Sequence, residues 1–162
     1  MKVLVMYYSK GGNTRKLAEA VLKGVDSVEG VQGVLRHTDD VTKEDFIEAG
    51  GIIAGSPVYF GTMAAPLKAV MDDFVSVRRK MEGKVGAAFA TSGDPTGGKE
   101  TTMMSIIQAF LIYGMVITGD PLAATGHYGV ACTGEPDDKT KENAEKLGKR
   151  VAGLALKLVG PD

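Results

Sequence analysis

The sequence contains no tryptophan, one cysteine and two histidines among its 162 residues. The single cysteine, Cys132, excludes an internal disulfide and a zinc site built from cysteines. His37 and His127 lie too far apart in the sequence to show the spacing of metal ligands. We therefore expect no metal site, and we interpret Cys132 as a small buried residue rather than a nucleophile.

A charge imbalance and long apolar runs are also absent. The formal net charge is −1, so the composition favours neither nucleic acid nor an anionic membrane as a partner. No apolar run reaches the roughly 18 residues that a membrane helix needs. The apolar start, MKVLVMYY, is too short for a signal peptide. We expect a cytoplasmic protein that makes no membrane contact.

Glycine, in contrast, is abundant, with 22 residues, and hydrophobic residues make up 44 % of the chain. The glycines gather at 11–12, 50–51, 93–98 and 126–134, beside apolar runs. This distribution is typical of turns at strand ends. The length suits one compact domain with its own core. We expect a single domain over residues 1–162.

Apolar runs alternate with amphipathic stretches along the chain. Strands are predicted at residues 2–8, 31–37, 50–56, 84–92 and 115–119, and helices at about 15–25, 42–49, 64–80, 100–113 and 139–159. Thr42 is a plausible cap for the second helix. The alternation predicts an α/β protein with a doubly wound, five-stranded parallel sheet in the order 2-1-3-4-5, with helices on both faces.

Ligands of such a sheet bind beyond the carboxyl ends of the strands, where the strand order reverses. The loops after strands 1, 3 and 4 meet there, and they are the glycine-bearing stretches SKGGNT, SPVYFGT and TSGDPTGGKE. SKGGNT ends a strand and opens a helix, so its unpaired amides and the helix dipole suit a phosphate. The alternative is a plain turn capped by Ser9 or Asn13.

The other two loops suit a flat ring. Tyr59 and Phe60 are adjacent aromatic residues on a turn, and they can stack on a planar ligand or close the edge of the core. The third loop runs Gly93 to Lys99 with the spacing of a triphosphate loop, but Glu100 replaces the hydroxyl residue that would hold magnesium. We interpret it instead as backbone donors for a polar ring edge.

Together the three loops resemble those of the flavodoxin-like family of FMN proteins. SKGGNT is similar to the family's phosphate loop, which ends in Gly-Asn-Thr, although Gly11 stands where flavodoxins usually have a hydroxyl residue. GSPVYFGTMAAPLKAVMDD, TSGDPTGGKETT and GMVITG are similar to the FMN-binding NAD(P)H:quinone oxidoreductases once named tryptophan-repressor-binding proteins. The resemblance covers essentially the whole chain and implies a flavodoxin-like fold with FMN as cofactor.

The chain also departs from both groups. The quinone enzymes have an inserted segment between the second and third strands that helps to build a tetramer, and residues 39–50 are too short for it. Tyr113 stands where those enzymes have a histidine, just before GMVI. Flavodoxins are usually strongly acidic, whereas this chain has a pI near 6.1.

The resemblance implies a role for each loop. Residues 9–14 would hold the FMN phosphate, and residues 57–61 would flank the isoalloxazine, with the peptide around Tyr59–Gly61 near N5. Residues 91–94, with Gly97 and Gly98, would line the pyrimidine edge. The implied cofactor-binding residues are Ser9, Lys10, Gly11, Gly12, Asn13, Thr14, Pro57, Val58, Tyr59, Phe60, Gly61, Thr91, Ser92, Gly93, Asp94, Gly97 and Gly98. No side chain is assigned a catalytic role.

Two functions follow from the resemblance, and a third reading stays open. The leading hypothesis is a flavodoxin that carries electrons between redox partner proteins. The alternative is an enzyme, an NAD(P)H:quinone oxidoreductase that reduces quinones with two electrons through FMN. The least favoured reading is a binding module without FMN. A homodimer is left open, because an apolar rim could form near the flavin, although we favour the same residues as core: Met63, Ala64, Ala65, Met103 and Met104.

Overall fold

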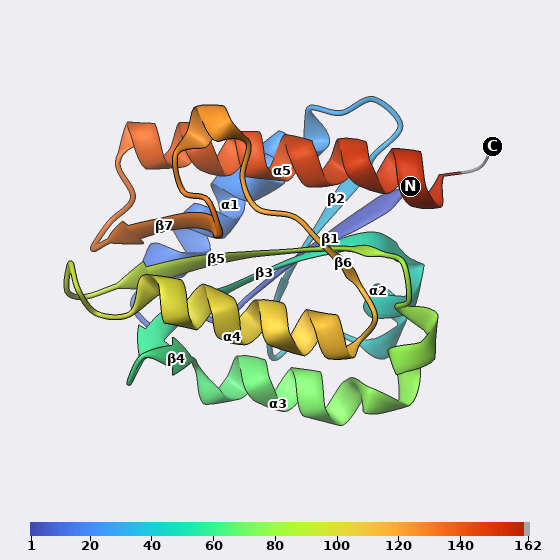
Figure 1. Ribbon diagram of the computed structural model, residues 1–162, viewed down its shortest axis with the longest axis horizontal. Helices are drawn as coiled ribbons and strands as arrows, with labels where there is room; N and C mark the ends of the chain where they lie inside the picture. The colour runs from blue at the N-terminus through green and yellow to red at the C-terminus, as the bar shows by residue number, and fades with distance from the viewer. Residues whose placement is uncertain (161–162) are drawn as a thin grey trace.

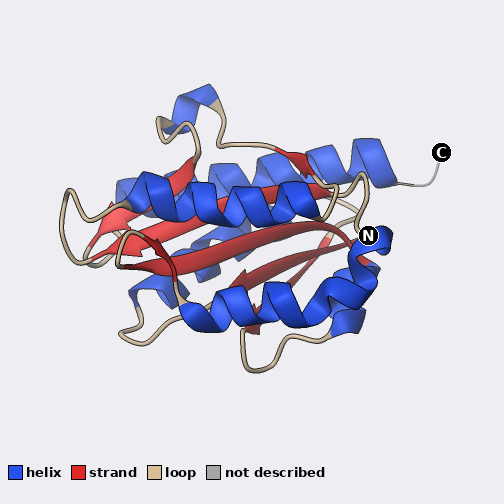
Figure 2. Cartoon of the chain, turned by 60° about the horizontal axis from the view of Figure 1, so that its bottom comes forward, coloured by secondary structure: helices blue, strands red, loops and turns tan. Residues whose placement is uncertain are grey.

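The computed structural model describes residues 1–160 and contains one mainly parallel sheet between two layers of helices (Figures 1 and 2). The strands are β1 (Lys2–Tyr7), β2 (Gln32–His37), β3 (Ala49–Tyr59), β4 (Thr62–Met63), β5 (Val85–Ser92), β6 (Val116–Ile117) and β7 (Gly129–Thr133). The helices are α1 (Asn13–Asp26), α2 (Lys43–Glu48), α3 (Ala65–Asp73), α4 (Lys99–Ile112) and α5 (Asp138–Val159), with 3₁₀ segments η1 (Phe74–Lys80) and η2 (Leu122–Ala124).

The predicted strand order is confirmed, with a correction to the number of strands. The sheet runs β2-β1-β3-β5-β6, which is the predicted order 2-1-3-4-5, but it has seven strands rather than five. The additional strands are β4, which pairs antiparallel with β3, and β7, which pairs with β5. Membrane-spanning helices are absent from the described residues 1–160.

The predicted fifth strand is in fact divided. β6 pairs only with Val85 and Gly86, and β7 pairs with β5 from Ala88 to Ser92. Residues 118–128 leave the sheet between them and lie over α5, where the Lys146 amine donates a hydrogen bond to the Ala123 carbonyl (Figure 1). No strand was predicted between residue 119 and the last helix, and this is wrong, because Gly129–Thr133 returns to the sheet as β7.

Two boundaries also differ from the prediction. Residues 57–59 were predicted as loop but continue β3, because Ser56 and Pro57 pair with β5. Pairing with β1 stops at Gly55, so Pro57 needs no backbone donor on that side. The helix predicted over 64–80 ends at Asp73 and continues as η1, where the β-branched Val75 and Val77 disfavour an α-helix.

The core is divided between the two faces of the sheet. One cluster lies under α1 and α5, and the other lies under α2, α3 and α4. The proposed rim residues Met63, Ala64 and Met103 are buried, as the core reading expects, whereas Ala65 and Met104 are exposed. The apolar runs thus stabilise the sheet from both sides, and the strand ends remain available for a site.

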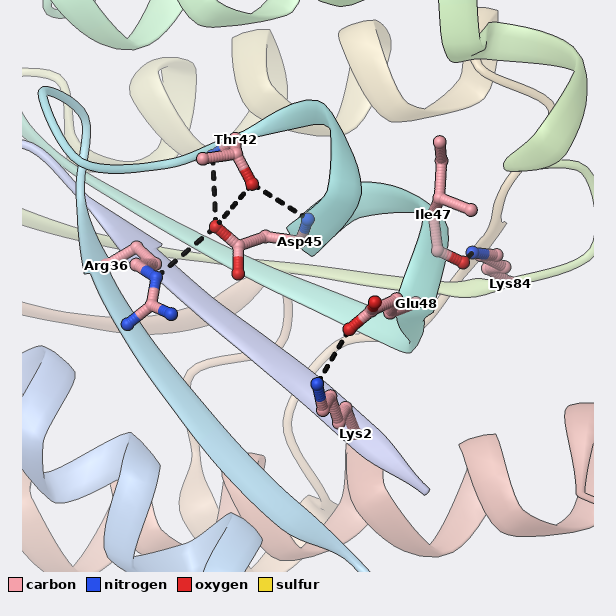
Figure 3. A network of polar contacts seen from close by, with 7 residues as sticks. All are labelled: Lys2, Arg36, Thr42, Asp45, Ile47, Glu48 and Lys84. Atoms are coloured by element: carbon pink, nitrogen blue, oxygen red, sulfur yellow. Dashed lines mark hydrogen bonds and ion pairs between the residues drawn. The ribbon is translucent and has the colours of Figure 1, made fainter.

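A polar network holds α2 in place (Figure 3). Thr42 caps the helix as predicted: its hydroxyl accepts a bond from the Asp45 amide, and the Asp45 carboxylate accepts one from the Thr42 amide. Burial raises the pKa of Asp45, but hydrogen bonds from Thr42 and Arg36 outweigh it and leave the pKa lowered. At the other end, the buried Lys84 amine donates to the Phe46 and Ile47 carbonyls.

Candidate functional site

The carboxyl ends of β1, β3 and β5 meet at one edge of the sheet, as the strand order predicts. A cavity of about 180 Å³ lies there. It is lined by residues from all three predicted loops and by one further residue: Ser9, Lys10, Gly11, Asn13, Thr14, Pro57, Val58, Tyr59, Thr91, Ser92, Gly93 and Gly134. The predicted residues outside this lining are Gly12, Phe60, Gly61, Asp94, Gly97 and Gly98. The structure therefore brings most of the predicted residues together.

The first loop leaves the start of α1 without a side-chain cap. Gly12 is the capping residue, with φ 92°, and its amide donates to the Ser9 hydroxyl. Neither Ser9 nor Asn13 is the capping residue of α1, although the Ser9 hydroxyl accepts the Gly12 amide within the turn. Gly12 is required there because an L side chain is strained at this φ. The uncapped amides of the first turn and the helix dipole make this end suitable for an anion.

The charges around the first loop also favour an anion at the start of α1. Arg15 pairs with Glu19, and Lys16 pairs with Glu135. Lys10 makes no ion pair within residues 1–160, and it lines the cavity. An unpaired ammonium beside an uncapped helix start favours a phosphate over a neutral group.

The second loop is the tip of a tight hairpin. Val58 pairs with Met63 and Tyr59 with Thr62, so Phe60 and Gly61 form a two-residue turn with φ 51° and 78°. Two positive φ values are the pattern of a type I′ turn, in which asparagine and glycine are preferred. Phe60 is fully exposed at this strained position. A large apolar side chain held in this way is costly unless it contacts a ligand or partner.

Tyr8 and His37, which were not predicted as site residues, support the hairpin from the ends of β1 and β2. The rings of Tyr8 and Tyr59 lie 6.3 Å apart, nearly perpendicular, and those of Tyr8 and His37 lie 5.6 Å apart. This row of aromatic rings positions Tyr59 at the cavity. Their place directly at the ends of β1 and β2 was the signal that could have revealed them.

The third loop is tied to the second. The Thr101 hydroxyl lies 2.6 Å from the Gly61 carbonyl, to which it donates, and 3.0 Å from the Gly98 carbonyl. The Gly61 carbonyl, which belongs to the peptide expected near N5, therefore already has a donor. Lys99 donates to the Thr133 hydroxyl, so the lysine of the triphosphate-like spacing is bonded to β7. Asp94 is exposed.

Gly134 is the lining residue that the prediction omitted. It follows β7, and its amide donates to the Ser92 carbonyl. Because β7 was not predicted, the loop after it could not be placed at the site. Tyr113, the position at which the resembled quinone enzymes have histidine, lies away from this cavity. Its hydroxyl donates to the Met71 carbonyl, and burial raises its pKa to about 12.

The geometry of the strand ends can be compared with known proteins. A family model described as NADPH-dependent FMN reductase matches residues 1–129. The chain belongs to the NADPH-dependent FMN reductase family. This membership, with relatives named flavodoxin, confirms the resemblance to flavodoxin-like FMN proteins and the prediction of FMN as cofactor.

Relatives of this family member carry two different names. A flavodoxin of Aquifex aeolicus is 38% identical over 157 residues, covering 93% of this chain and 85% of the relative. An NAD(P)H dehydrogenase (quinone) of Archaeoglobus fulgidus is 34% identical over 188 positions, covering 97% of this chain and 98% of the relative. Both names correspond to the two functions that the sequence left open.

Solved structures agree on the fold of this FMN reductase-family chain. A flavodoxin, WrbA-like protein from Agrobacterium tumefaciens has a TM-score of 0.84 at 24% identity and covers 97% of this chain and 98% of its own. A flavodoxin from the domain Archaea has a TM-score of 0.80 at 28% identity and covers 96% and 99%. The flavodoxin-like fold is therefore confirmed.

Proposed function

We propose that residues 1–162 form a single FMN-binding domain that acts as a flavodoxin, an electron carrier between redox partner proteins. The observation that carries the proposal is the uncapped start of α1, with the unpaired Lys10, at a cavity that two further loops complete. The proposal places the carrier in the cytoplasm, where a reduced thiol such as that of Cys132 persists.

In this proposal each loop holds one part of FMN. Residues 9–14 bind the phosphate, Tyr59 and Phe60 flank the ring, and residues 91–98 face its polar edge. The cavity of about 180 Å³ is smaller than the roughly 300–1,000 Å³ of most ligand pockets, so it suits the phosphate end. The ring would then lie at the hairpin tip, where the aromatic side chains are exposed.

The cavity lining favours a carrier over acid–base chemistry. Within the described residues, it contains no carboxylate, imidazole or thiol, and its titratable side chains are those of Lys10 and Tyr59. Bound FMN supplies the redox chemistry, because it accepts and returns electrons singly or in pairs. The side chains of the site orient the group and set its electrostatic surroundings.

The second candidate is an FMN-dependent NAD(P)H:quinone oxidoreductase. A large apolar groove that reaches Tyr59 and Phe60 favours it, because a carrier has no need of a small-molecule site there. In this reaction NAD(P)H gives up a hydride, which is two electrons and one proton. The quinone takes both electrons, that proton and a second proton from solvent, and it leaves as the quinol.

One measurement separates the candidates. The purified protein is first tested for FMN, which should be released on denaturation. Oxidation of NAD(P)H is then followed with and without benzoquinone. A carrier retains FMN but shows no quinone-dependent oxidation of NAD(P)H, whereas the enzyme consumes NAD(P)H and quinone in equal amounts. Colourless protein that does not take up added FMN would contradict both candidates.

A further inference from the structure

A large apolar groove lies between α3 and α4 and shares only Tyr59 with the lining of the cavity at the strand ends. Its volume is about 990 Å³. It begins at the hairpin tip with Tyr59 and Phe60, passes between α3 and α4, which lie side by side in Figure 1, and ends near Val75 and Tyr113. We call it the α3–α4 groove. Its volume and apolar lining are those of a small-molecule site.

The two helices on the opposite face of the sheet pack much more closely. There α1 and α5 touch at their backbones. A Cβ added to Gly148 would lie 2.1 Å from the Val21 carbonyl oxygen, and one added to Gly24 would lie 1.9 Å from the Glu145 carbonyl oxygen. Glycine thus allows α1 and α5 to touch, whereas α3 and α4 stay apart.

Several polar side chains of the α3–α4 groove are bonded within the protein. Lys68 binds Asp72 at 2.7 Å, and the Arg78 guanidinium donates to the Ile112 carbonyl at 2.6 Å. The Ser105 hydroxyl donates to the Thr102 carbonyl and accepts from the Met63 amide. Lys68 and Asp72 neutralise each other, and Arg78, a lining cation without an ion pair within residues 1–160, is exposed to solvent. Apolar and aromatic side chains form most of the lining, so the occupant that fits is uncharged and apolar.

The groove adjoins the cavity at the strand ends. Tyr59 lines both, and the exposed Phe60 stands at the groove's mouth. A ligand that fills the groove lengthwise therefore has one end at the turn that would flank the FMN ring. An elongated, uncharged molecule with a redox-active end meets both conditions.

We propose that the α3–α4 groove binds the hydrocarbon tail of a quinone whose ring lies at Tyr59 and Phe60. The inference rests on the second candidate function, because it names the class of quinone. Each methylene buried in the groove should tighten binding up to about fourfold. A tail of several carbons should therefore tighten binding by at least about tenfold over the bare ring.

The test uses the purified full-length protein with its FMN and no reductant. Two oxidised quinones are titrated by calorimetry: 2,3-dimethoxy-5-methylbenzoquinone, which has no tail, and its decyl-tailed analogue. The expected result is a dissociation constant at least about tenfold lower for the tailed compound. Equal constants for the two quinones would overturn the proposal.

Two matched variants locate the tail. Ile112→Glu puts a charge on the groove wall, and Leu111→Glu puts the same charge on the adjacent residue, outside the lining. Both side chains are exposed at the end of α4, so both variants should fold and retain FMN. Only Ile112→Glu should abolish the advantage of the tailed quinone. If both variants lose the advantage of the tailed quinone, or if neither does, the assignment to the groove is overturned.

Other occupants give different results. If a second copy covers the groove, sedimentation will show a dimer that Ile112→Glu dissociates, and the tail will have no effect; this outcome overturns the proposal. Tail-dependent binding that Ile112→Glu removes supports the proposal even where NAD(P)H is not oxidised. Absence of NAD(P)H oxidation would refute only the quinone-reducing function. Failure of the proposed function and failure of the tail-binding proposal can therefore be told apart.

Discussion

The hydroxyl oxygens of Thr14 and Thr91 lie 2.8 Å apart and form a buried hydrogen bond that joins the start of α1 to the end of β5. These residues are separated by 77 positions in the chain. Their contact fixes the first predicted loop against the third. The site is therefore held together by the protein's own contacts at the point where the phosphate end of FMN is proposed to bind.

Replacing Thr91 with valine tests this contact. The change keeps the shape but leaves the Thr14 hydroxyl without its partner, so the free energy of unfolding should fall by about 1 kcal/mol. Chemical denaturation of the two proteins measures it. Thr102→Val is the matched control, because the buried Thr102 hydroxyl has no partner in the described structure. This control should be neutral or stabilising, and a loss equal to that of Thr91→Val would contradict the explanation.

The phosphate assignment predicts a charge effect at Gly11. A Cβ there meets nothing within 4 Å, and the backbone is not left-handed, so a substitution should leave the fold intact. Gly11→Asp should weaken FMN binding more than tenfold, because its carboxylate repels the phosphate. Fluorescence titration of the apoprotein with FMN measures the change. Gly11→Asn has nearly the same size without the charge, and a similar loss in this variant would argue against an electrostatic cause.

Phe60 should show a conflict between stability and binding. Because its φ of 51° suits asparagine, Phe60→Asn should raise the free energy of unfolding by roughly 1 kcal/mol. The same change removes a ring beside the proposed flavin and should weaken FMN binding about tenfold. Phe60→Tyr, which keeps both the ring and the strain, should change neither quantity much. Unaltered FMN affinity in Phe60→Asn would remove this residue from the site.

Lys84 should be important for the end of α2. It is only 8% exposed, and its amine donates to the carbonyls of Phe46 and Ile47. Lys84→Met leaves both carbonyls unsatisfied and should lower the free energy of unfolding by about 1–3 kcal/mol. Lys80→Met, at an exposed position, should stay within about 0.5 kcal/mol of the wild type in the same denaturation experiment.

Cys132 should react slowly with thiol reagents while the protein is folded. Burial raises its pKa to about 11, although the nearby Lys99 opposes this shift. At pH 8 only about one thiol in a thousand would then be ionised, and the thiolate is the reactive form. Disulfide-exchange labelling in native buffer should be much slower than in denaturant. Labelling at equal rates would show that the thiol is accessible and ionised.

Much of the fold could be read from local pattern. The periodic residues Leu17 and Val21 face the core from α1, and Thr42 caps α2 as expected. The predicted strand order places the three loops together, as the cavity lining confirms. These predictions succeeded because apolar periodicity, capping and parallel connections depend on nearby residues and on general rules of chain topology.

The sequence by itself determined the five helices, four of the strands and part of the fifth, and which loops meet at the carboxyl edge of the sheet. The tertiary structure alone decided that β7 returns to β5, that Gly134 joins the site, and that Tyr8 supports Tyr59. It also decided that α1 and α5 touch while α3 and α4 leave a groove. Each of these depends on pairings between residues distant in the chain, whose free energy is gained only when the whole sheet has assembled.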